Sequence, residues 1–444
     1  MNLVKRFGQA LHKNRPHLVG NGCLTPLIAR TEFETRRSNL LRLMKPNSLA
    51  IFGGNRIQYA SPSVFYPFRQ DPNFQYLTGF LEPESCLLLH KDVNDKGEAI
   101  LLVPEKNEFA EKWEGERTGI EGAKQEFGFE NVISNEKLRE TVQNLISKVS
   151  KVYADIDPKT TMRQTSFYSH ELPKMVFSKL DLQCASTLCM QLRIIKSESE
   201  LDCLRIAGEI SSEVYNMAMT QEFKSETQLQ SYLSFMFRNN GLEDDSYYPV
   251  VAGGDHALTI HYVRNDDLLK NEDLVLVDAA GRYGGYCADI SRTWPVGGKL
   301  SEAQKDIYEV VLDTNKQCIT KCTVKSGMSL YDLHSFSEQV MKQNLANIGL
   351  DMTMNELRTI YPHMIGHQLG LDVHDIDISD ASSSEFVSNQ VITVEPGLYF
   401  PHDSRFPKRF RGIGIRIEDD IVVGEDMPEN LTEACWKEVA DVQR

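Results

Sequence analysis

Three features are missing from the sequence, and each absence excludes a class of protein. No apolar run approaches the roughly 18 residues that a membrane helix requires, so we expect no membrane span. Positive charge is in the minority, with 48 lysines and arginines against 63 acids, and the net charge of −15 argues against nucleic-acid binding. The nine cysteines are an odd number for a fully paired framework and form no C-x-x-C motif, which favours free thiols in a reducing compartment and no structural zinc.

The composition is that of a globular protein with more than one domain. Hydrophobic residues make up 41% and charged residues 25% of the 444 residues, a length too great for one ordinary core. Residues 49–104 alternate short apolar segments with turns, and helical patterns at 30–43 and 136–148 lie on either side. A short strand is expected at 151–156. This part therefore indicates a modest α/β domain with a mixed sheet.

A domain boundary is expected near Arg193. Ser197 and Glu200 form an S-x-x-E capping box, the signature of a new helix. We therefore assign residues 29–192 to an N-terminal domain and residues 193–444 to a C-terminal domain.

The C-terminal domain is predicted to be α+β, with helices grouped against a largely antiparallel sheet. Helical periodicity covers the segment after the capping box and two further stretches, 226–238 and 302–321. Short strands are expected at 248–252, 259–263, 274–279, 286–294, 391–395 and 413–423.

The first 31 residues carry five basic residues and no acid. Apolar side chains through Phe7 and Leu11 could share one face of a short helix, a pattern typical of a mitochondrial transit peptide. Residues 1–28 are therefore interpreted as a targeting leader. The alternative is a basic arm that packs on the body of the protein.

Asp278 and Asp289 are expected to face each other across a β-hairpin. Segments 274–279 and 286–294 alternate apolar residues on either side of a glycine-rich turn. With the turn centred on the bond before Gly284, the two aspartates are in register on the core-facing side. Two carboxylates that converge there need a shared proton or a cation. The alternative is an ordinary hairpin with one solvated aspartate.

Three further residues, His367, Glu395 and Glu418, could complete a metal site. His367 is one of three histidines in a twelve-residue segment, although a lone histidine in an apolar sequence is usually a core residue. Glu395 ends an apolar strand just before Pro-Gly. Glu418 lies in a segment of period 2 and could instead be only the partner of the arginine two positions before it.

Together, Asp278, Asp289, His367, Glu395 and Glu418 form a coherent ligand set. Four carboxylates and one imidazole carry about the charge that two divalent cations neutralise, and oxygen-rich ligation favours Mn²⁺ over zinc. Two such cations can share a water, lower its pKa and supply a hydroxide nucleophile near neutral pH. A dinuclear hydrolase is therefore favoured over scattered acids.

Five motifs follow one another along the chain: Val277-Asp-Ala-Ala-Gly, Ala288-Asp-Ile-Ser-Arg-Thr-Trp-Pro, the segment from His363 to Asp375, Val394-Glu-Pro-Gly-Leu-Tyr and Ile415-Arg-Ile-Glu-Asp. This set resembles that of the metal-dependent aminopeptidase P family, which has the pita-bread (creatinase/methionine aminopeptidase) fold. Segments after Phe68 and Trp113 are similar to the family's N-terminal domain. The leader resembles that of the mitochondrial branch, the intermediate-cleaving peptidases.

The resemblance implies two divalent metal ions, with Mn²⁺ as the first expectation, held by the five residues above. Asp289 and Glu418 would bridge the two ions. Glu395 would also act as the base that activates the water.

The resemblance implies further roles around the metals. As catalytic residues, His261 would contact the scissile peptide and His374 would stabilise the developing oxyanion. His363 would line the pocket for the residue after the cleaved bond. Arg416 is expected to be a further catalytic residue, and Tyr399 a further substrate-binding residue. Both would orient the groups that take part in this chemistry.

The expected reaction is release of one N-terminal residue from peptides or proteins. Two substrate classes stay open. Xaa-Pro bonds suit a pocket shaped for proline's fixed φ and missing N–H. The mitochondrial branch implies proteins that keep a bulky N-terminal residue after presequence removal.

Two rival functions are weighed against this one. A prolidase-type Xaa-Pro dipeptidase has the same ligands, but no cationic residue can be assigned to the free carboxylate of a dipeptide. A non-catalytic pita-bread binding module would typically lack several ligands that are present here. We expect N-termini as substrates, no nucleic-acid partner, a homodimer as one assembly, and the mitochondrial matrix as the location, with cytoplasm and nucleus as alternatives.

Overall fold

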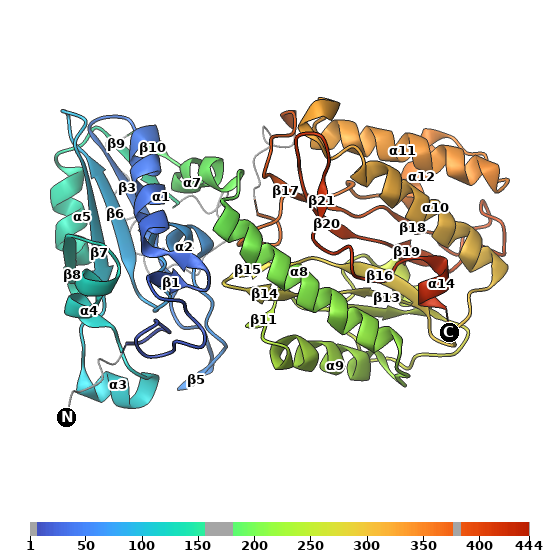
Figure 1. Ribbon diagram of the computed structural model, residues 1–444, viewed down its shortest axis with the longest axis horizontal. Helices are drawn as coiled ribbons and strands as arrows, with labels where there is room; N and C mark the ends of the chain where they lie inside the picture. Colours follow the sequence, from blue (N-terminus) through green and yellow to red (C-terminus); the bar gives the residue numbers. More distant parts are fainter. Residues whose placement is uncertain (1–6, 156–180, 376–382, 444) are drawn as a thin grey trace. The chain divides into compact units, whose positions relative to one another are not determined.

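The computed structural model describes residues 7–155, 181–375 and 383–443 and divides the chain into two compact units, Met1–Leu192 and Arg193–Arg444 (Figure 1). Each unit encloses its own hydrophobic core. All nine cysteines lie among the described residues, and all are free thiols. No described helix is both long and apolar enough to cross a membrane.

The first unit is built on a mixed six-stranded sheet of order β10-β9-β3-β6-β7-β8. Strands β3, β6 and β7 are antiparallel neighbours, whereas β9 joins β3, β10 joins β9 and β8 joins β7 in parallel. The six strands are β3 (Ser48–Gly53), β6 (Cys86–Lys91), β7 (Gly97–Val103), β8 (Asn131–Ser134), β9 (Lys151–Ala154) and β10 (Asp181–Gln183). The predicted mixed sheet is confirmed.

Helices cover both faces of this sheet (Figure 1). Leu138, Val142 and Leu145 of α5 are buried in one cluster with Leu49 and Leu88 of the sheet, and α1 and α2 lie on the opposite face. The helices are α1 (Arg30–Leu43), α2 (Pro72–Thr78), α3 (Glu108–Glu114), α4 (Gly119–Glu126), the 3₁₀ turn η1 (Asn135–Lys137), α5 (Leu138–Ile146) and α7 (Ala185–Arg193). Two small hairpins complete the unit: β1 (Cys23–Thr25) with β2 (Ile28–Ala29), and β4 (Tyr59–Ser61) with β5 (Val64–Phe65).

The described part of the N-terminal segment is a packed arm. Residues 7–22 form turns without a helix, and Phe7 and Leu11 are buried. The Leu11 N–H donates to Asn14 Oδ1 (2.7 Å) rather than to the backbone one helical turn earlier. Buried Gln9 donates to Gly79 O (2.9 Å). The predicted helix through Phe7 and Leu11 is therefore wrong for the described residues, because side-chain hydrogen bonds and burial hold this segment in turns.

The second unit places antiparallel strand pairs among long helices (Figure 1). Its helices are α8 (Glu198–Met219), α9 (Glu226–Asn239), η2 (Gly254–Leu258), α10 (Glu302–Ile319), η3 (Val324–Ser326), α11 (Leu330–Asn347), α12 (Met354–Ile360) and α14 (Val439–Val442). Capping boxes begin α8, α10, α11 and α12, and Ser225 caps α9. The apolar faces of these helices supply much of the main core.

The strands of this unit form four small sheets with the orders β12-β13-β16, β11-β14-β15, β17-β20-β21 and β18-β19. Their bounds are β11 (Asp244–Asp245), β12 (Val250–Gly253), β13 (Leu274–Asp278), β14 (Gly281–Tyr283), β15 (Tyr286–Cys287), β16 (Ser291–Pro295), β17 (Val391–Val394), β18 (Gly397–Tyr399), β19 (Gly414–Arg416), β20 (Asp419–Val422) and β21 (Glu429–Asn430). Every pairing between these strands is antiparallel, so the predicted α+β class is confirmed.

The predicted hairpin exists, but its register was wrong by two residues. Asp278 pairs with Ser291, and the turn is centred between Gly284 and Gly285. Asp289 lies in a short break between β15 and β16. A shift of two keeps each side chain on its face, which is why the two aspartates still approach each other.

Two other strand predictions were wrong. Residues 259–263 are not a strand, because the chain turns through η2 and enters a loop there. Residues 413–423 are not one strand but two, since β19 pairs with β18 whereas β20 pairs with β17. Glu418 therefore lies at a break in the backbone, and the period-2 argument that placed it beside Arg416 does not hold.

Candidate active site

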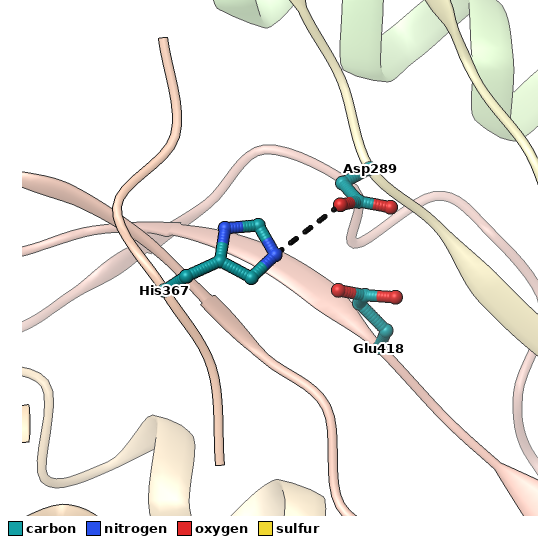
Figure 2. A group of neighbouring side chains, drawn as sticks. All are labelled: Asp289, His367 and Glu418. Atoms are coloured by element: carbon teal, nitrogen blue, oxygen red, sulfur yellow. Dashed lines mark ion pairs between the residues drawn. The ribbon is translucent and has the colours of Figure 1, made fainter. Parts of the chain in front are cut away.

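Five segments of the second unit bring the predicted ligands together. Asp278 ends β13, and Asp289 lies in the break before β16. His367 follows α12 in a coil, Glu395 comes directly after β17, and Glu418 lies between β19 and β20. Figure 2 shows the side chains of Asp289, His367 and Glu418 pointing from separate segments toward one space.

The distances within this cluster suit metal coordination. Ligand atoms of Asp289, His367 and Glu418 all lie within 4.8 Å of one another, the one such group found in the described part of the chain. His367 Nε2 is 3.5 Å from Asp289 Oδ2 and 3.8 Å from Glu395 Oε1. Asp289 and Glu418 are buried, whereas the side chains of His367 and Glu395 keep 21% and 19% exposure. The cluster is thus open to solvent on one side.

Tyr247 connects Asp278 to the cluster. Its hydroxyl lies 2.5 Å from Asp278 Oδ1 and 2.6 Å from Asp289 Oδ1. Sequence reasoning missed Tyr247, because no motif spacing connects it to either aspartate. The strand pairing would have found it, since Val250, three residues later, pairs with Asp278.

Crowding of carboxylates in a largely buried site shifts their protonation equilibria. Burial, with the negative charge of Asp289, raises the pKa of Glu418 well above its usual value. Burial raises the pKa of Glu395 to about 7 and raises the pKa of Asp278, although Arg416 opposes both shifts. These acids thus resist full ionisation together unless positive charge joins them.

The pKa of His367 is also raised, but for an imidazole this shift favours the charged form. Burial opposes its charged form, but the hydrogen bond to Asp289 and the negative charge of Glu395 outweigh burial and raise the pKa of His367 to about 9. His367 Nδ1 lies 3.0 Å from Gln368 O, which leaves Nε2 facing the carboxylates. The ring is therefore oriented as a metal-ligating imidazole would be.

Arg416, Tyr399 and His363 form a chain of hydrogen bonds that begins at Asp278. Arg416 Nη2 donates to Asp278 Oδ2 (2.5 Å), and Nη1 donates to the Tyr399 hydroxyl (2.9 Å). That hydroxyl lies 2.9 Å from His363 Nε2, and His363 Nδ1 lies 2.8 Å from Met364 O. Burial and the charge of Arg416 lower the pKa of His363 to about 3, so His363 is neutral and accepts from Tyr399.

Ser291 and Asp420 support the ligands and were also missed. Ser291 Oγ donates to Glu418 Oε2 (2.6 Å) and accepts from Arg416 Nε (2.8 Å). Asp420 Oδ2 accepts the backbone N–H of Asp289 (3.0 Å). Each lies two residues after a ligand, and a search for polar residues at that spacing would have found both.

His261 and His374 lie at the edge of the cluster. The His374 ring centroid is 4.2 Å from that of His367. His261 is exposed and lies near enough to His363 for its charge to contribute to the lowered pKa of His363, after burial and Arg416. The structure therefore brings together the five proposed ligands with Arg416, Tyr399, His363 and His374, whereas His261 is placed only within electrostatic range of His363.

The donor set fits divalent cations. It combines four carboxylates and one imidazole with a single permanent cation, Arg416. Asp278 and Glu418 keep raised pKa values in spite of that guanidinium, so negative charge exceeds positive charge in the site. Oxygen-rich sites with one nitrogen suit hard divalent metals.

Both parts of the chain match known families. Residues 202–425 match metallopeptidase family M24, and residues 33–153 match the aminopeptidase P N-terminal domain. Among curated proteins, the chain is 42% identical to intermediate cleaving peptidase 55 of Saccharomyces cerevisiae, over 98% of this chain and 88% of the relative. It is 34% identical to Xaa-Pro aminopeptidase 3 of Rattus norvegicus (99% and 90%) and 33% identical to the mitochondrial intermediate cleaving peptidase 55 of Arabidopsis thaliana (99% and 87%).

Solved structures agree with this assignment. The crystal structure of Icp55 from Saccharomyces cerevisiae superposes with a TM-score of 0.86 at 41% identity, over 95% of this chain and 98% of that one. A zinc-substituted Escherichia coli aminopeptidase P in complex with product gives a TM-score of 0.86 at 30% identity, over 94% and 97%. The predicted family and pita-bread fold are confirmed. The chain belongs to metallopeptidase family M24 and is a metalloaminopeptidase of the aminopeptidase P type, which removes single N-terminal residues.

Proposed function

We propose that Asp278, Asp289, His367, Glu395 and Glu418 hold two divalent cations, with Mn²⁺ as the resident metal. The observation that carries this proposal is the excess of buried negative charge around His367. When bound, two cations would activate a water and polarise the scissile carbonyl. Oxygen-rich ligation favours Mn²⁺ over zinc. The Escherichia coli relative was solved in a zinc-substituted form, which is consistent with a different resident metal.

The remaining residues are assigned to positioning and proton transfer. Glu395, whose side chain is partly open to solvent, would accept the proton of the attacking water. His374 and His261 would donate hydrogen bonds to the carbonyl as it gains negative charge. Arg416, which also donates to the Tyr399 hydroxyl, would fix Asp278, and neutral His363 would line the pocket for the residue after the cleaved bond.

For the substrate, we propose proteins that have just lost a mitochondrial presequence and keep one surplus N-terminal residue. Relatives named intermediate cleaving peptidases, one of them mitochondrial, support this substrate and a mitochondrial location. Xaa-Pro peptides are the second candidate, because other relatives are named Xaa-Pro aminopeptidases.

Sequencing of protein N-termini in mitochondria with and without this chain tests the substrate. We expect a set of proteins to become one residue longer when the chain is absent. Unchanged N-termini in the presence of active enzyme would contradict the import role and leave Xaa-Pro peptides as the candidate.

A peptide panel on the purified, manganese-loaded protein separates the enzymatic alternatives. The panel contains an Xaa-Pro dipeptide, a longer Xaa-Pro peptide, and a peptide with a bulky first residue and no proline. We expect release of one residue from the longer peptides and little cleavage of the dipeptide. Preference for the dipeptide would indicate a prolidase, and no cleavage of any peptide would indicate a binding module.

A further inference from the structure

One buried carboxylate holds the loop that carries His261. The loop leaves β12 at Gly253, passes through η2 and returns to α9 near Asp267. Glu226, at the first position of α9, is fully buried and takes part in none of the chemistry described above. Its side chain nevertheless contacts the loop at both ends and in the middle.

Four hydrogen bonds converge on the Glu226 carboxylate. Oε1 accepts from the Gly253 N–H (2.9 Å) and lies 2.8 Å from His256 Nδ1. Oε2 accepts from the Tyr262 hydroxyl (2.8 Å) and from the Asp267 N–H (3.0 Å). An ionised carboxylate offers about four acceptor sites, so all of them are in use. Two of the donors are backbone groups at opposite ends of the loop.

Neighbouring contacts complete the attachment. The Glu226 N–H donates to Asp267 O (3.0 Å), and the Thr227 hydroxyl donates to Asn265 O (2.6 Å). Buried Asn265 accepts from the Val251 N–H (2.9 Å). The loop is therefore bound to both α9 and β12 at a distance of only a few residues from His261.

Tyr262 transmits this attachment to the active site. Its ring packs in one apolar cluster with Leu276 and Tyr399, and Tyr399 in turn contacts His363. Burial and the hydrogen bond to Glu226 raise the pKa of Tyr262 to about 12, so its hydroxyl keeps the proton that it donates. His261 directly precedes Tyr262, and the position of its backbone follows from that of Tyr262.

We propose that Glu226 is a positioning residue for His261, and that it acts on turnover through this loop alone. The inference rests on the proposed role of His261 at the scissile peptide. A glutamine at position 226 keeps the shape, but its amide nitrogen cannot accept the two hydrogen bonds that reach one of the carboxylate oxygens. One end of the loop, or the Tyr262 contact, would then be released.

A double-mutant cycle of Glu226→Gln with His261→Ala tests the inference in the metal-loaded enzyme. We expect Glu226→Gln alone to lower kcat by about tenfold to a hundredfold with little change in KM, because small displacements of a catalytic group have effects of that size. In the His261→Ala background, we expect a further loss of no more than about twofold. Metal content should match that of the wild type in every variant.

Two more variants separate positioning from general loss of structure. Tyr262→Phe removes only one of the four hydrogen bonds, and we expect a smaller loss of kcat that also disappears without His261. Glu200→Gln is the matched control, because Glu200 is a buried carboxylate of the same unit that accepts from the Tyr286 hydroxyl (2.7 Å) away from this loop. We expect kcat to be unchanged in Glu200→Gln.

The outcomes are distinguishable. Full activity in Glu226→Gln, or a loss that is undiminished in the His261→Ala background, would overturn the positioning role and leave the proposed function intact. Full activity in His261→Ala would instead refute the proposed role of His261, and the inference would fall with it.

Discussion

Glu418 and Asp419 are neighbours in the chain, and both are buried, but their environments are opposite. Asp419 receives hydrogen bonds from Arg292 Nη2 (2.8 Å) and Lys437 Nζ (2.6 Å). Burial opposes its ionisation, but these two cations outweigh burial and hold the pKa of Asp419 well below its usual value. Glu418 has carboxylates as its main charged neighbours, and its pKa is raised.

The charged neighbours of these two residues distinguish a carboxylate with a structural role from one with a functional role. The Asp419 cluster is complete, because its positive partners are part of the chain. The Glu418 cluster is incomplete, because four carboxylates share one guanidinium and one imidazole. Burial alone therefore does not identify an active site. The informative feature is a buried charge that the protein itself does not balance.

The largest expected effect comes from Asp289→Asn. This change removes the carboxylate that lies 3.5 Å from His367 Nε2 and accepts a hydrogen bond from the Tyr247 hydroxyl (2.6 Å). We expect kcat/KM to fall by at least about a thousandfold, because loss of a bound metal removes several kcal/mol of transition-state stabilisation. Peptide hydrolysis and metal content are measured on the same sample.

The stability of metal-free Asp289→Asn sharpens the comparison. Since the substitution removes one like charge from an unbalanced cluster, the unfolding free energy of the metal-free protein should not fall. A variant that kept its metal and its turnover would contradict the assignment of Asp289 as a ligand.

Asp419→Asn should show the reverse pattern. It leaves buried Arg292 and partly buried Lys437 without their carboxylate partner. Breaking such a pair typically lowers the unfolding free energy by about 3–5 kcal/mol. Urea unfolding measures that loss, and bound metal per folded molecule should stay unchanged. Loss of bound metal without loss of stability in Asp419→Asn would contradict the assignment of Asp419 to a structural cluster that is distinct from the proposed metal ligands.

Periodic and capping signals predicted much of the fold. Helix α1 has the predicted bounds, and α8 begins at the predicted capping box. The hairpin register failed because the turn was centred one residue too early. Gly284 and Gly285 both have positive φ (61° and 88°), which a two-residue turn of this kind requires, so the Gly-Gly pair marks the true centre.

The cluster around His367 could be predicted because each of its proposed ligands lies in a local motif, whereas two residues that support it could not be found from local spacing. Tyr247 and Glu226 act through hydrogen bonds to segments that are distant in the sequence. No local spacing encodes such contacts. Residues 259–263 alternate like a strand, but they lie in a loop whose two ends donate backbone hydrogen bonds to the distant Glu226 carboxylate, from Gly253 and Asp267.

The smallest expected effect concerns a second balanced cluster, around Asp375. Asp375 is buried, forms an ion pair with Arg193 and lies 3.2 Å from Lys196 Nζ, and Asp372 shares Arg193 at 2.8 Å. Burial opposes ionisation, but Arg193 and Lys196 outweigh it and lower the pKa of Asp375 from 3.8 to about 2. The folded state therefore binds this proton less readily than the unfolded state.

The sign of the pH dependence follows from that lowered pKa. The stabilisation by Asp375, about 2 kcal/mol, is complete above the unfolded pKa of 3.8 and is lost as the pH falls from 3.8 toward about 2. We expect the difference in unfolding free energy between wild type and Asp375→Asn to be constant from pH 6 to about pH 4.5 and to shrink by about 1 kcal/mol at pH 3. Urea unfolding at each pH measures it. A difference that stayed constant down to pH 3 would show that Arg193 and Lys196 do not balance Asp375 as Arg292 and Lys437 balance Asp419.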